Sequence, residues 1–337
     1  MILKTRLINL IDKIKLFCSK YLLLKANMNE TFKKQLYSIA KIIISLIAYV
    51  YIYFKLKDFD FNINFDSSRL YLLILAFLFL FDNWGFEALK WQFLIKKYEK
   101  ITLFKSYKSI FSGVTSSVFT PNRVGEFVGR IFYISDKNKA KAVLSTIVGS
   151  YSQVLITLML GTIAFFLSKP IVISGFQINS FELKLVFSAL TLVLLFLFFN
   201  VSVLSSLAKK LNLSDKFQKT FNSLELYSKI DLAKILALSF FRYLVFALQF
   251  VLLVLFFDIN ITLINILLGL AQFYLVLLII PTISIAEPGI RGIVAMAVFS
   301  QYTNNVEMII ISISVLWLIN IVIPALLGSV VMLLDKE

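Results

Sequence analysis

Charged residues inside long apolar stretches are the part of this sequence most able to do chemistry. A charge within a bilayer is costly, so such residues usually mark a functional pathway. The positions of this kind are Asp82, Glu87, Arg123, Glu126, Arg130, Arg242, Glu287 and Arg291. The four basic ones are all arginines, whose guanidinium group stays charged after desolvation and grips phosphate with two parallel hydrogen bonds. The set predicts that these arginines bind a phosphate group.

Helical spacing groups most of these charges into two motifs. In the first, Glu126 stands three residues after Arg123 and four before Arg130. A short helix would place all three on one face. In the second, Glu287 and Arg291 repeat the four-residue spacing. Each motif therefore predicts a compact group of opposite charges rather than isolated ones.

Proline and glycine next to these charges predict breaks in the backbone, at Pro121, Gly125 and Gly289. Freed N–H groups at such breaks can face an anion. Carboxylates among the arginines would balance their charge in the empty site and could bind a proton or a cationic group when a ligand displaces them. These counter-charges are Asp82, Glu87, Glu126 and Glu287. The alternative is that the charges form internal ion pairs that pin the chain and bind no ligand.

The overall composition places these residues in an integral membrane protein. Of 337 residues, 59% are hydrophobic and 16% are charged, whereas a soluble domain has about 45–50% and about 25%. Histidine is absent and Cys18 is the single cysteine, which excludes disulfides, thiolate metal sites and histidine-based catalysis. The sequence has no glycine-rich nucleotide-binding loop and no room for a basic nucleic-acid-binding domain. We expect no cofactor, no metal and no ATP hydrolysis in this chain.

Six apolar stretches approach the roughly 20 residues that a membrane-spanning helix needs. They are residues 36–54, 70–93, 142–167, 183–204, 235–257 and 308–334. Two more apolar stretches, 107–134 and 263–299, are interrupted by the charged motifs. The sequence thus predicts an all-α polytopic protein of the cell membrane. Residues 1–34 are predicted to form a basic amphipathic cytoplasmic segment, and residues 35–337 a single integral membrane domain.

Basic loops indicate how the two interrupted stretches are oriented, because short cytoplasmic loops are rich in lysine and arginine. Basic clusters at Lys90–Lys108 and Lys137–Lys141 flank the first stretch, whereas Asp258 and Glu307 flank the second. A re-entrant hairpin from the cytoplasm keeps both basic clusters inside, and the second hairpin then enters from the outer side. Both chain termini are predicted to be cytoplasmic, and the formal charge of +15 lies almost wholly on that side.

The order span, hairpin, span occurs twice under this topology. Helix 70–93, hairpin 107–134 and helix 142–167 form one unit, and helix 235–257, hairpin 263–299 and helix 308–334 form a second in the opposite orientation. Many secondary transporters use inverted pairs with broken helices near the midplane to build a site reachable from either face. The sequence therefore predicts an inverted repeat.

The two motifs also carry a resemblance to a known family. Residues 119–130, with the sequence Phe-Thr-Pro-Asn-Arg-Val-Gly-Glu-Phe-Val-Gly-Arg, resemble the Pro-x-Arg-x-Gly-Glu-x-x-x-Arg signature of the membrane domain of lysylphosphatidylglycerol synthases and the flippase-like family around it. Residues 281–292 resemble that family's Gly-rich second signature, although Pro288 replaces a small or aliphatic residue. The resemblance extends over roughly residues 35–334. The matching positions are Pro121, Arg123, Gly125, Glu126, Arg130, Glu287, Gly289 and Arg291.

The resemblance implies a membrane protein that handles lipids, because in the aminoacyl-lipid synthases this domain is associated with moving the modified phospholipid between leaflets. Those synthases also carry a soluble carboxyl-terminal aminoacyltransferase domain, whereas this sequence ends at Glu337. We therefore expect the chain not to be a complete lysyl-lipid synthase.

Three functional hypotheses follow. The leading one is a lipid transporter or flippase-like protein that binds the phosphate of a phospholipid or polyprenyl-phosphate lipid in an intramembrane cavity. The alternative is a membrane glycosyl or head-group transferase with a polyprenyl-phosphate donor, in which Asp58 and Asp60 hold a divalent metal. A third hypothesis is a scaffold that only assembles partners. The sequence favours a transporter over an enzyme.

Overall fold

The computed structural model describes residues 66–335, with gaps at 119, 121–122, 169–170, 174–175, 179–180, 202, 204–214 and 281–286. Four features of the sequence analysis lie outside these residues. They are the amino-terminal segment, the first predicted span, Asp58 with Asp60, and Pro121.

Five long apolar helices form the described bundle, and each is long enough to cross a membrane. They correspond to the five predicted spans that fall within the described residues. Their bounds are α3 (Leu70–Ile95), α6 (Lys139–Leu167), α7 (Phe181–Phe199), α10 (Lys229–Phe256), and α13 (Val306–Trp317) continued by the π-helix η6 (Leu318–Val322) and α14 (Ile323–Leu334). The chain is thus an all-α polytopic membrane protein. A two-stranded hairpin of β1 (Ile171–Ile173) and β2 (Phe176–Ile178) joins α6 to α7.

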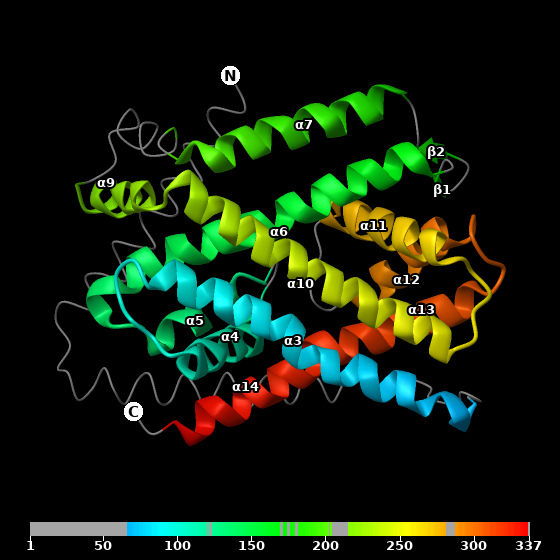
Figure 1. The fold of residues 1–337 in the computed structure, drawn as a ribbon, viewed down its shortest axis with the longest axis horizontal. Helices are drawn as coiled ribbons and strands as arrows, with labels where there is room; N and C mark the ends of the chain where they lie inside the picture. The colour runs from blue at the N-terminus through cyan, green and yellow to red at the C-terminus, as the bar shows by residue number, and fades with distance from the viewer. Residues whose placement is uncertain are drawn as a thin grey trace.

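The long helices run alternately between two ends of the molecule (Figure 1). One end carries α9 (Asp215–Asn222) and η5 (Ser223–Leu226), and the other carries the β-hairpin. Ion pairs at each end join residues that the topology places on one side of the membrane. Arg69 Nη1 lies 2.6 Å from Asp258 Oδ1, and Lys97 Nζ lies 2.7 Å from Asp231 Oδ2. The alternation agrees with the predicted topology, while the assignment of one end to the cytoplasm stays a prediction.

Two pairs of shorter helices occupy the interrupted stretches. The first pair is α4 (Leu103–Ser117) with α5 (Gly125–Arg130), followed by η3 (Ile131–Tyr133) and η4 (Asp136–Asn138); the second is α11 (Leu263–Ile279) with α12 (Glu287–Phe299). The 15 residues of α4 extend about 22 Å, less than the roughly 30 Å of a bilayer core. The pairs lie toward opposite ends of the bundle (Figure 1), as oppositely oriented hairpins would. Their entry into a bilayer stays a prediction.

The packing of these pairs supports the predicted inverted repeat. Helix α4 packs against α14, the last span of the second unit, and α11 packs against α6, the last span of the first unit. Helices α3 and α10, which open the two units, pack along each other. If the two units are interchanged, the contact of α4 with α14 becomes the contact of α11 with α6, and α3 still packs along α10. Two units related by a two-fold axis have this property.

Glycines permit the closest of these helix contacts. A Cβ on Gly328 of α14 would lie 2.1 Å from the carbonyl oxygen of Phe111 in α4. A Cβ on Gly161 of α6 would lie 2.6 Å from the Cβ of Leu275 in α11. Neither site has room for a side chain, so each hairpin helix reaches the backbone of the other unit's last span. Small residues at such interfaces are typical of helix packing in membranes.

Candidate functional site

The carboxylate of Glu87 lies at the centre of a buried group of charges. Its Oε1 atom is 2.8 Å from Arg130 Nη2, and its Oε2 atom is 2.8 Å from both Lys90 Nζ and Arg242 Nη1. The exposed fractions of the side chains are 3% for Glu87, 3% for Arg130 and 1% for Lys90, but 20% for Arg242. One carboxylate therefore receives three cations in a site almost closed to solvent. We call these four residues, together with Glu126, the Glu87 cluster.

The cluster forms where three helices meet. On α3, Glu87 and Lys90 are three residues apart and so share a face. That face is covered by α10, which contributes Arg242. Helix α5 contributes Arg130 and Glu126, which also form an ion pair with each other. The four-residue spacing from Glu126 to Arg130 is thus used within α5, but Arg123 precedes this helix and does not share its face as predicted.

Glycines hold α5 against α4 and so position Arg130. A Cβ on Gly125 would lie 1.8 Å from the carbonyl oxygen of Ser116, and a Cβ on Gly129 would lie 2.2 Å from that of Ser112. Because only hydrogen fits at both positions, the two backbones touch. Ser109 Oγ also donates to the carbonyl oxygen of Arg130 at 2.5 Å. In the structure Gly125 therefore permits a close approach between helices, and its N–H donates to Thr120 Oγ1 at 2.8 Å.

Two tryptophans of α3 flank the arginines. The guanidinium carbon of Arg242 lies 4.8 Å from the ring centroid of Trp84, and that of Arg130 lies 5.4 Å from the ring of Trp91. These distances are within the range of cation–π attraction, which is strongest for desolvated cations over tryptophan. The rings therefore stabilise both arginines while leaving their edges available for hydrogen bonds.

A row of amides links the cluster to the carboxyl-terminal helix. Arg242 Nε donates to Asn83 Oδ1 at 3.1 Å, and Asn83 in turn donates to Asn320 Oδ1. Asn320 Nδ2 donates to Gln249 Oε1 at 3.1 Å. Asn320 belongs to the π-helix η6, a distortion that frequently marks functional sites in helices. The orientation of Arg242 is thus coupled to the shape of the last span.

The position of Lys90 contradicts two predictions made from the sequence. The prediction that a cytoplasmic basic loop begins at Lys90 is wrong, because α3 continues to Ile95 and buries this side chain. Lys90 is also a deep cation that is not an arginine. Beyond Glu87, its Nζ donates to the carbonyl oxygen of Gly149 at 3.2 Å and to Ser239 Oγ at 3.0 Å. The three-residue spacing from Glu87 is the signal in the sequence that could have identified it.

The cluster and the two tryptophans beside it contain more hydrogen-bond donors than acceptors. Arg130 Nε, Trp84 Nε1 and Trp91 Nε1 are buried and have no hydrogen-bond partner among the described residues. The cluster also has an excess of positive charge, since three cations face two carboxylates. Arg123 adds to this excess, because it is half-buried and close enough to interact electrostatically with Glu126 and Arg242. Its φ angle of 57° places its backbone in the left-handed region. The site as a whole is suited to an acceptor-rich anion.

Not every predicted site residue joins the cluster. Asp82 is exposed on α3, on a face turned away from Glu87. Arg291 lies on α12, where its guanidinium carbon is 5.9 Å from the ring centroid of Tyr274. Glu287 begins α12, but its side chain is outside the described part of the structure. A Cβ on Gly289 would meet nothing within 4 Å, so packing in the described residues does not require glycine there.

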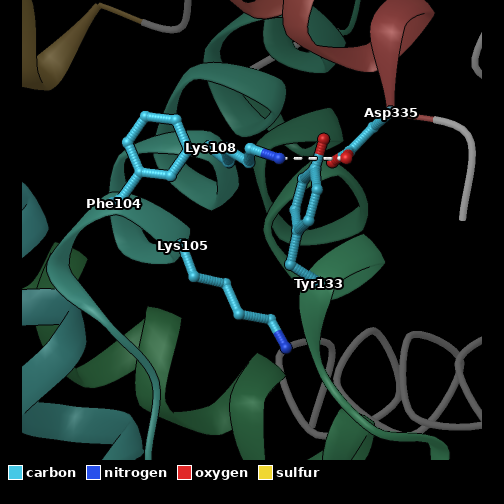
Figure 2. Close-up of a pocket in the computed structure, with 5 residues that line it drawn as sticks. All are labelled: Phe104, Lys105, Lys108, Tyr133 and Asp335. Atoms are coloured by element: carbon cyan, nitrogen blue, oxygen red, sulfur yellow. Dashed lines mark hydrogen bonds and ion pairs between the residues drawn. The ribbon is translucent and has the colours of Figure 1, made fainter.

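A separate pocket lies at the end of the molecule where α4 approaches α14 (Figure 2). Its lining consists of Phe104, Lys105, Lys108, Tyr133 and Asp335. Lys108 Nζ donates to Asp335 Oδ1 at 2.9 Å and lies 5.3 Å from the ring centroid of Phe104. None of these residues belongs to the Glu87 cluster. The ion pair joins the first residues of α4 to the end of α14.

Comparison with known proteins identifies the family. Residues 38–331 match the family model described as lysylphosphatidylglycerol synthase TM region. The match covers most of the chain, so the chain belongs to this family, as the two motifs predict. Both the Glu87 cluster and the second motif lie inside the matched residues. No curated protein matches the chain.

Proposed function

We propose that this member of the lysylphosphatidylglycerol synthase transmembrane-region family moves a phosphate-bearing lipid between leaflets, and that the Glu87 cluster binds the phosphate. The family links the chain to lipid handling in the membrane. The lipid is a phospholipid or a polyprenyl-phosphate, since both present the same acceptor group. Its hydrocarbon chains remain in the bilayer while the head group enters the bundle.

The excess of donors is the observation that supports this function most strongly. A buried donor without an acceptor costs about 1–3 kcal/mol, and three such donors lie on Arg130 and on the two tryptophans that flank the arginines. Internal ion pairs that served only to pin the helices would balance donors and acceptors. The oxygens of a phosphate bound by the arginines would supply acceptors and one negative charge.

The exposed members of the cluster indicate how the head group enters. Arg242 and Glu126 are the least buried, with side chains 20% and 19% exposed. A phosphate arriving on this side first meets Arg242 and the neighbouring Arg123. It then competes with Glu126 for Arg130, while the deeper Glu87 keeps its own ion pairs. Glu126 is therefore the counter-charge that a ligand displaces.

Lipid binding to the purified protein tests this function. Arg242→Gln should weaken retention of phosphatidylglycerol at least about tenfold, because a hydrogen bond to a charged group is worth about 1.5–3 kcal/mol. Arg123→Ala should weaken it in the same direction. Diacylglycerol, which has no phosphate, should bind weakly and equally to all proteins. Native mass spectrometry in detergent measures the lipid-bound fractions directly.

Arg69→Gln is the matched control for this experiment. Arg69 is also an ion-paired arginine of the bundle, with Asp258 at 2.6 Å, but it lies at the end of α3 away from the cluster. Its replacement should leave the phosphatidylglycerol-bound fraction unchanged. Equal retention by wild type and folded Arg242→Gln would refute the proposed site and favour ion pairs that only hold the helices together.

A further inference from the structure

Lys90 is the one cation of the Glu87 cluster that can exchange a proton in the pH range in which proteins are stable. An arginine stays protonated in proteins, whereas a buried lysine changes protonation state readily. Lys90 is also the deepest of the three cations, with a side chain only 1% exposed. The head-group binding described above involves the arginines and assigns no role to this lysine.

The surroundings of Lys90 act on its charge in opposite directions. Burial disfavours the ammonium group, as do the guanidinium groups of Arg242 on α10 and Arg130 on α5, which share Glu87 with it. The Glu87 carboxylate, 2.8 Å from the nitrogen, favours the ammonium form. Helix α6 faces Lys90 with the uncharged Gly149 carbonyl and, through Ser239, with Ser152. A change in the local charge can therefore shift Lys90 between its ammonium and amine forms.

A pair of serines next to Lys90 can serve both protonation states. Ser239 Oγ lies 3.0 Å from Lys90 Nζ and 2.7 Å from Ser152 Oγ. Against an ammonium group, Ser239 accepts from Lys90 and donates to Ser152. Against a neutral amine, both hydroxyls can rotate, so that Ser152 donates to Ser239 and Ser239 donates to the nitrogen lone pair. In either protonation state, the amine and both hydroxyls have a hydrogen-bond partner.

Charge balance distinguishes the empty cluster from the occupied one. With Lys90 protonated, the five residues of the cluster carry three positive and two negative charges, and Arg123 beside them adds one more positive charge. The empty site therefore has an excess of positive charge, which disfavours the ammonium form of Lys90. A phosphodiester carries one negative charge, so its arrival reduces this excess and favours the uptake of a proton by Lys90. Buried charges are tolerated when they are paired.

We propose that Lys90 takes up one proton when a phosphate-bearing head group enters the Glu87 cluster and releases it when the head group leaves. In this step the amine of Lys90 binds one H⁺ from water and becomes an ammonium ion, and no other bond changes. Lipid binding is thereby coupled to proton binding. This inference rests on the proposed function, since it requires the head group to occupy the cluster.

Isothermal titration calorimetry on the full-length protein in detergent tests the coupling. The probe is a short-chain phosphatidylglycerol, whose phosphodiester does not titrate from about pH 6 to about pH 9. Titrations in two buffers with different enthalpies of ionisation give the number of protons taken up per lipid. Wild type should approach one proton per lipid at the alkaline end, and its affinity should fall by up to about tenfold per pH unit.

Two variants assign the proton to Lys90. Lys90→Arg keeps the charge fixed and Lys90→Met removes it, so neither should take up a proton and neither affinity should depend on pH. A purely structural role for Lys90 would change the affinity without changing the proton count. Proton uptake that persists in both variants would place the proton on a carboxylate and overturn the inference.

The wild-type titration is decisive even where a variant does not fold. Phosphatidylglycerol that binds wild type with no proton uptake and with one affinity throughout the pH range would overturn the role of Lys90 and leave the proposed function standing. Failure of wild type to bind the lipid at every pH would instead overturn the proposed function itself.

Discussion

Glu87 is the residue on which the buried charges depend, because it is the shared partner of Lys90, Arg130 and Arg242. A buried ion pair contributes little net stability, but removing one partner leaves an uncompensated charge. Here a single substitution would leave three cations with only Glu126 between them. Glu87 is therefore expected to matter more for folding than the residues that surround it.

Glu87→Gln should lower the free energy of unfolding by roughly 3–5 kcal/mol, the usual cost of breaking a buried pair from one side. Glu307→Gln is the control, because Glu307 is exposed at the start of α13 and should change stability by less than about 0.5 kcal/mol. Denaturant titration followed by tryptophan fluorescence measures both. A similar loss in the two variants would show that Glu87 is not the centre of the charge network.

Glu99 gives the described structure a pH-dependent contact outside the long helices. Burial raises the pKa of its carboxyl, but hydrogen bonds from the side chains of Ser135 and Asn138 and from the Ser135 N–H outweigh burial, so the pKa is lowered. A lowered pKa means that the contact adds stability above the ordinary value of 4.5 and loses it as the pH falls through the folded-state value.

Glu99→Gln should therefore be less stable than wild type at neutral pH, and the difference should shrink as the pH falls below 4.5. Thermal unfolding of both proteins in one detergent over a pH series measures the difference. Ser135→Ala removes one donor and should reduce the pH dependence in the same direction. A stability difference that stays constant with pH would contradict the assignment.

The membrane-depth charges could be predicted from residue type and position, whereas their partners could not. Glu87, Glu126, Arg130 and Arg242 do meet, as side chains that need paired charges should. Sequence spacing excludes Asp82 from this group, since five residues along a helix turn the side chain about 140° from Glu87. Lys90 was missed because it was grouped with the lysines that follow it in a basic loop, although the predicted span 70–93 contains it. The pairing itself requires α3 to pack along α10, which no local pattern encodes.

At the scale of elements, α5 is the component that makes the site. It has only six residues, and its position depends on contacts with α4 rather than on its own helical stability. Gly125 and Gly129 allow those contacts, and Arg130 and Glu126 project from the same short helix. The arrangement places two members of the Glu87 cluster on a segment that a small change in packing would shift.

Gly129→Ala should disturb this arrangement, because its Cβ would lie 2.2 Å from the Ser112 carbonyl oxygen. Overpacking of this kind costs about 1–3 kcal/mol. We also expect weaker phosphatidylglycerol binding, since Arg130 is the next residue. Gly289→Ala is the matched control, as its Cβ would meet nothing within 4 Å, and stability should be unchanged or slightly higher. Unfolding and lipid-binding measurements on both variants check this prediction, and equal behaviour would contradict it.

Among the described elements, the predicted spans match the long helices, because length and hydropathy define a span without reference to neighbours. Each interrupted stretch forms a pair of shorter helices, α4 with α5 in the first and α11 with α12 in the second. Sequence patterns indicate the breaks in these stretches but not the partners across the bundle. That α4 contacts α14 and α11 contacts α6 follows from backbone-to-backbone packing at Gly328 and Gly161, which becomes visible only in three dimensions.

In the whole molecule, the two units that we predict to have opposite orientations exchange their hairpin contacts. The exchange of hairpins between the units places α4 against α14 and α11 against α6, so each hairpin bears on the last span of the other unit. A movement of one unit relative to the other would therefore carry a hairpin with it. Such coupling is what alternating access requires of an inverted repeat.

Cysteine labelling tests the predicted orientation of the hairpins. In a Cys18→Ser background, Lys100→Cys and Lys137→Cys flank α4 and α5, and Asn260→Cys and Asn304→Cys flank α11 and α12; all four positions are exposed. An impermeant maleimide should label the last two in intact cells and the first two only after permeabilisation. Opposite labelling within either pair would show that the chain crosses the membrane there and would refute that hairpin.

Lipid movement in proteoliposomes measures the proposed transport itself. Fluorescent phosphatidylglycerol is placed in both leaflets, and an impermeant quencher reports its arrival at the outer one. Wild type and Arg69→Gln should both raise the rate above that of protein-free liposomes, and Arg242→Gln, reconstituted in equal amount and folded, should not. Equal rates for Arg242→Gln and wild type, or no movement with wild type, would contradict the account.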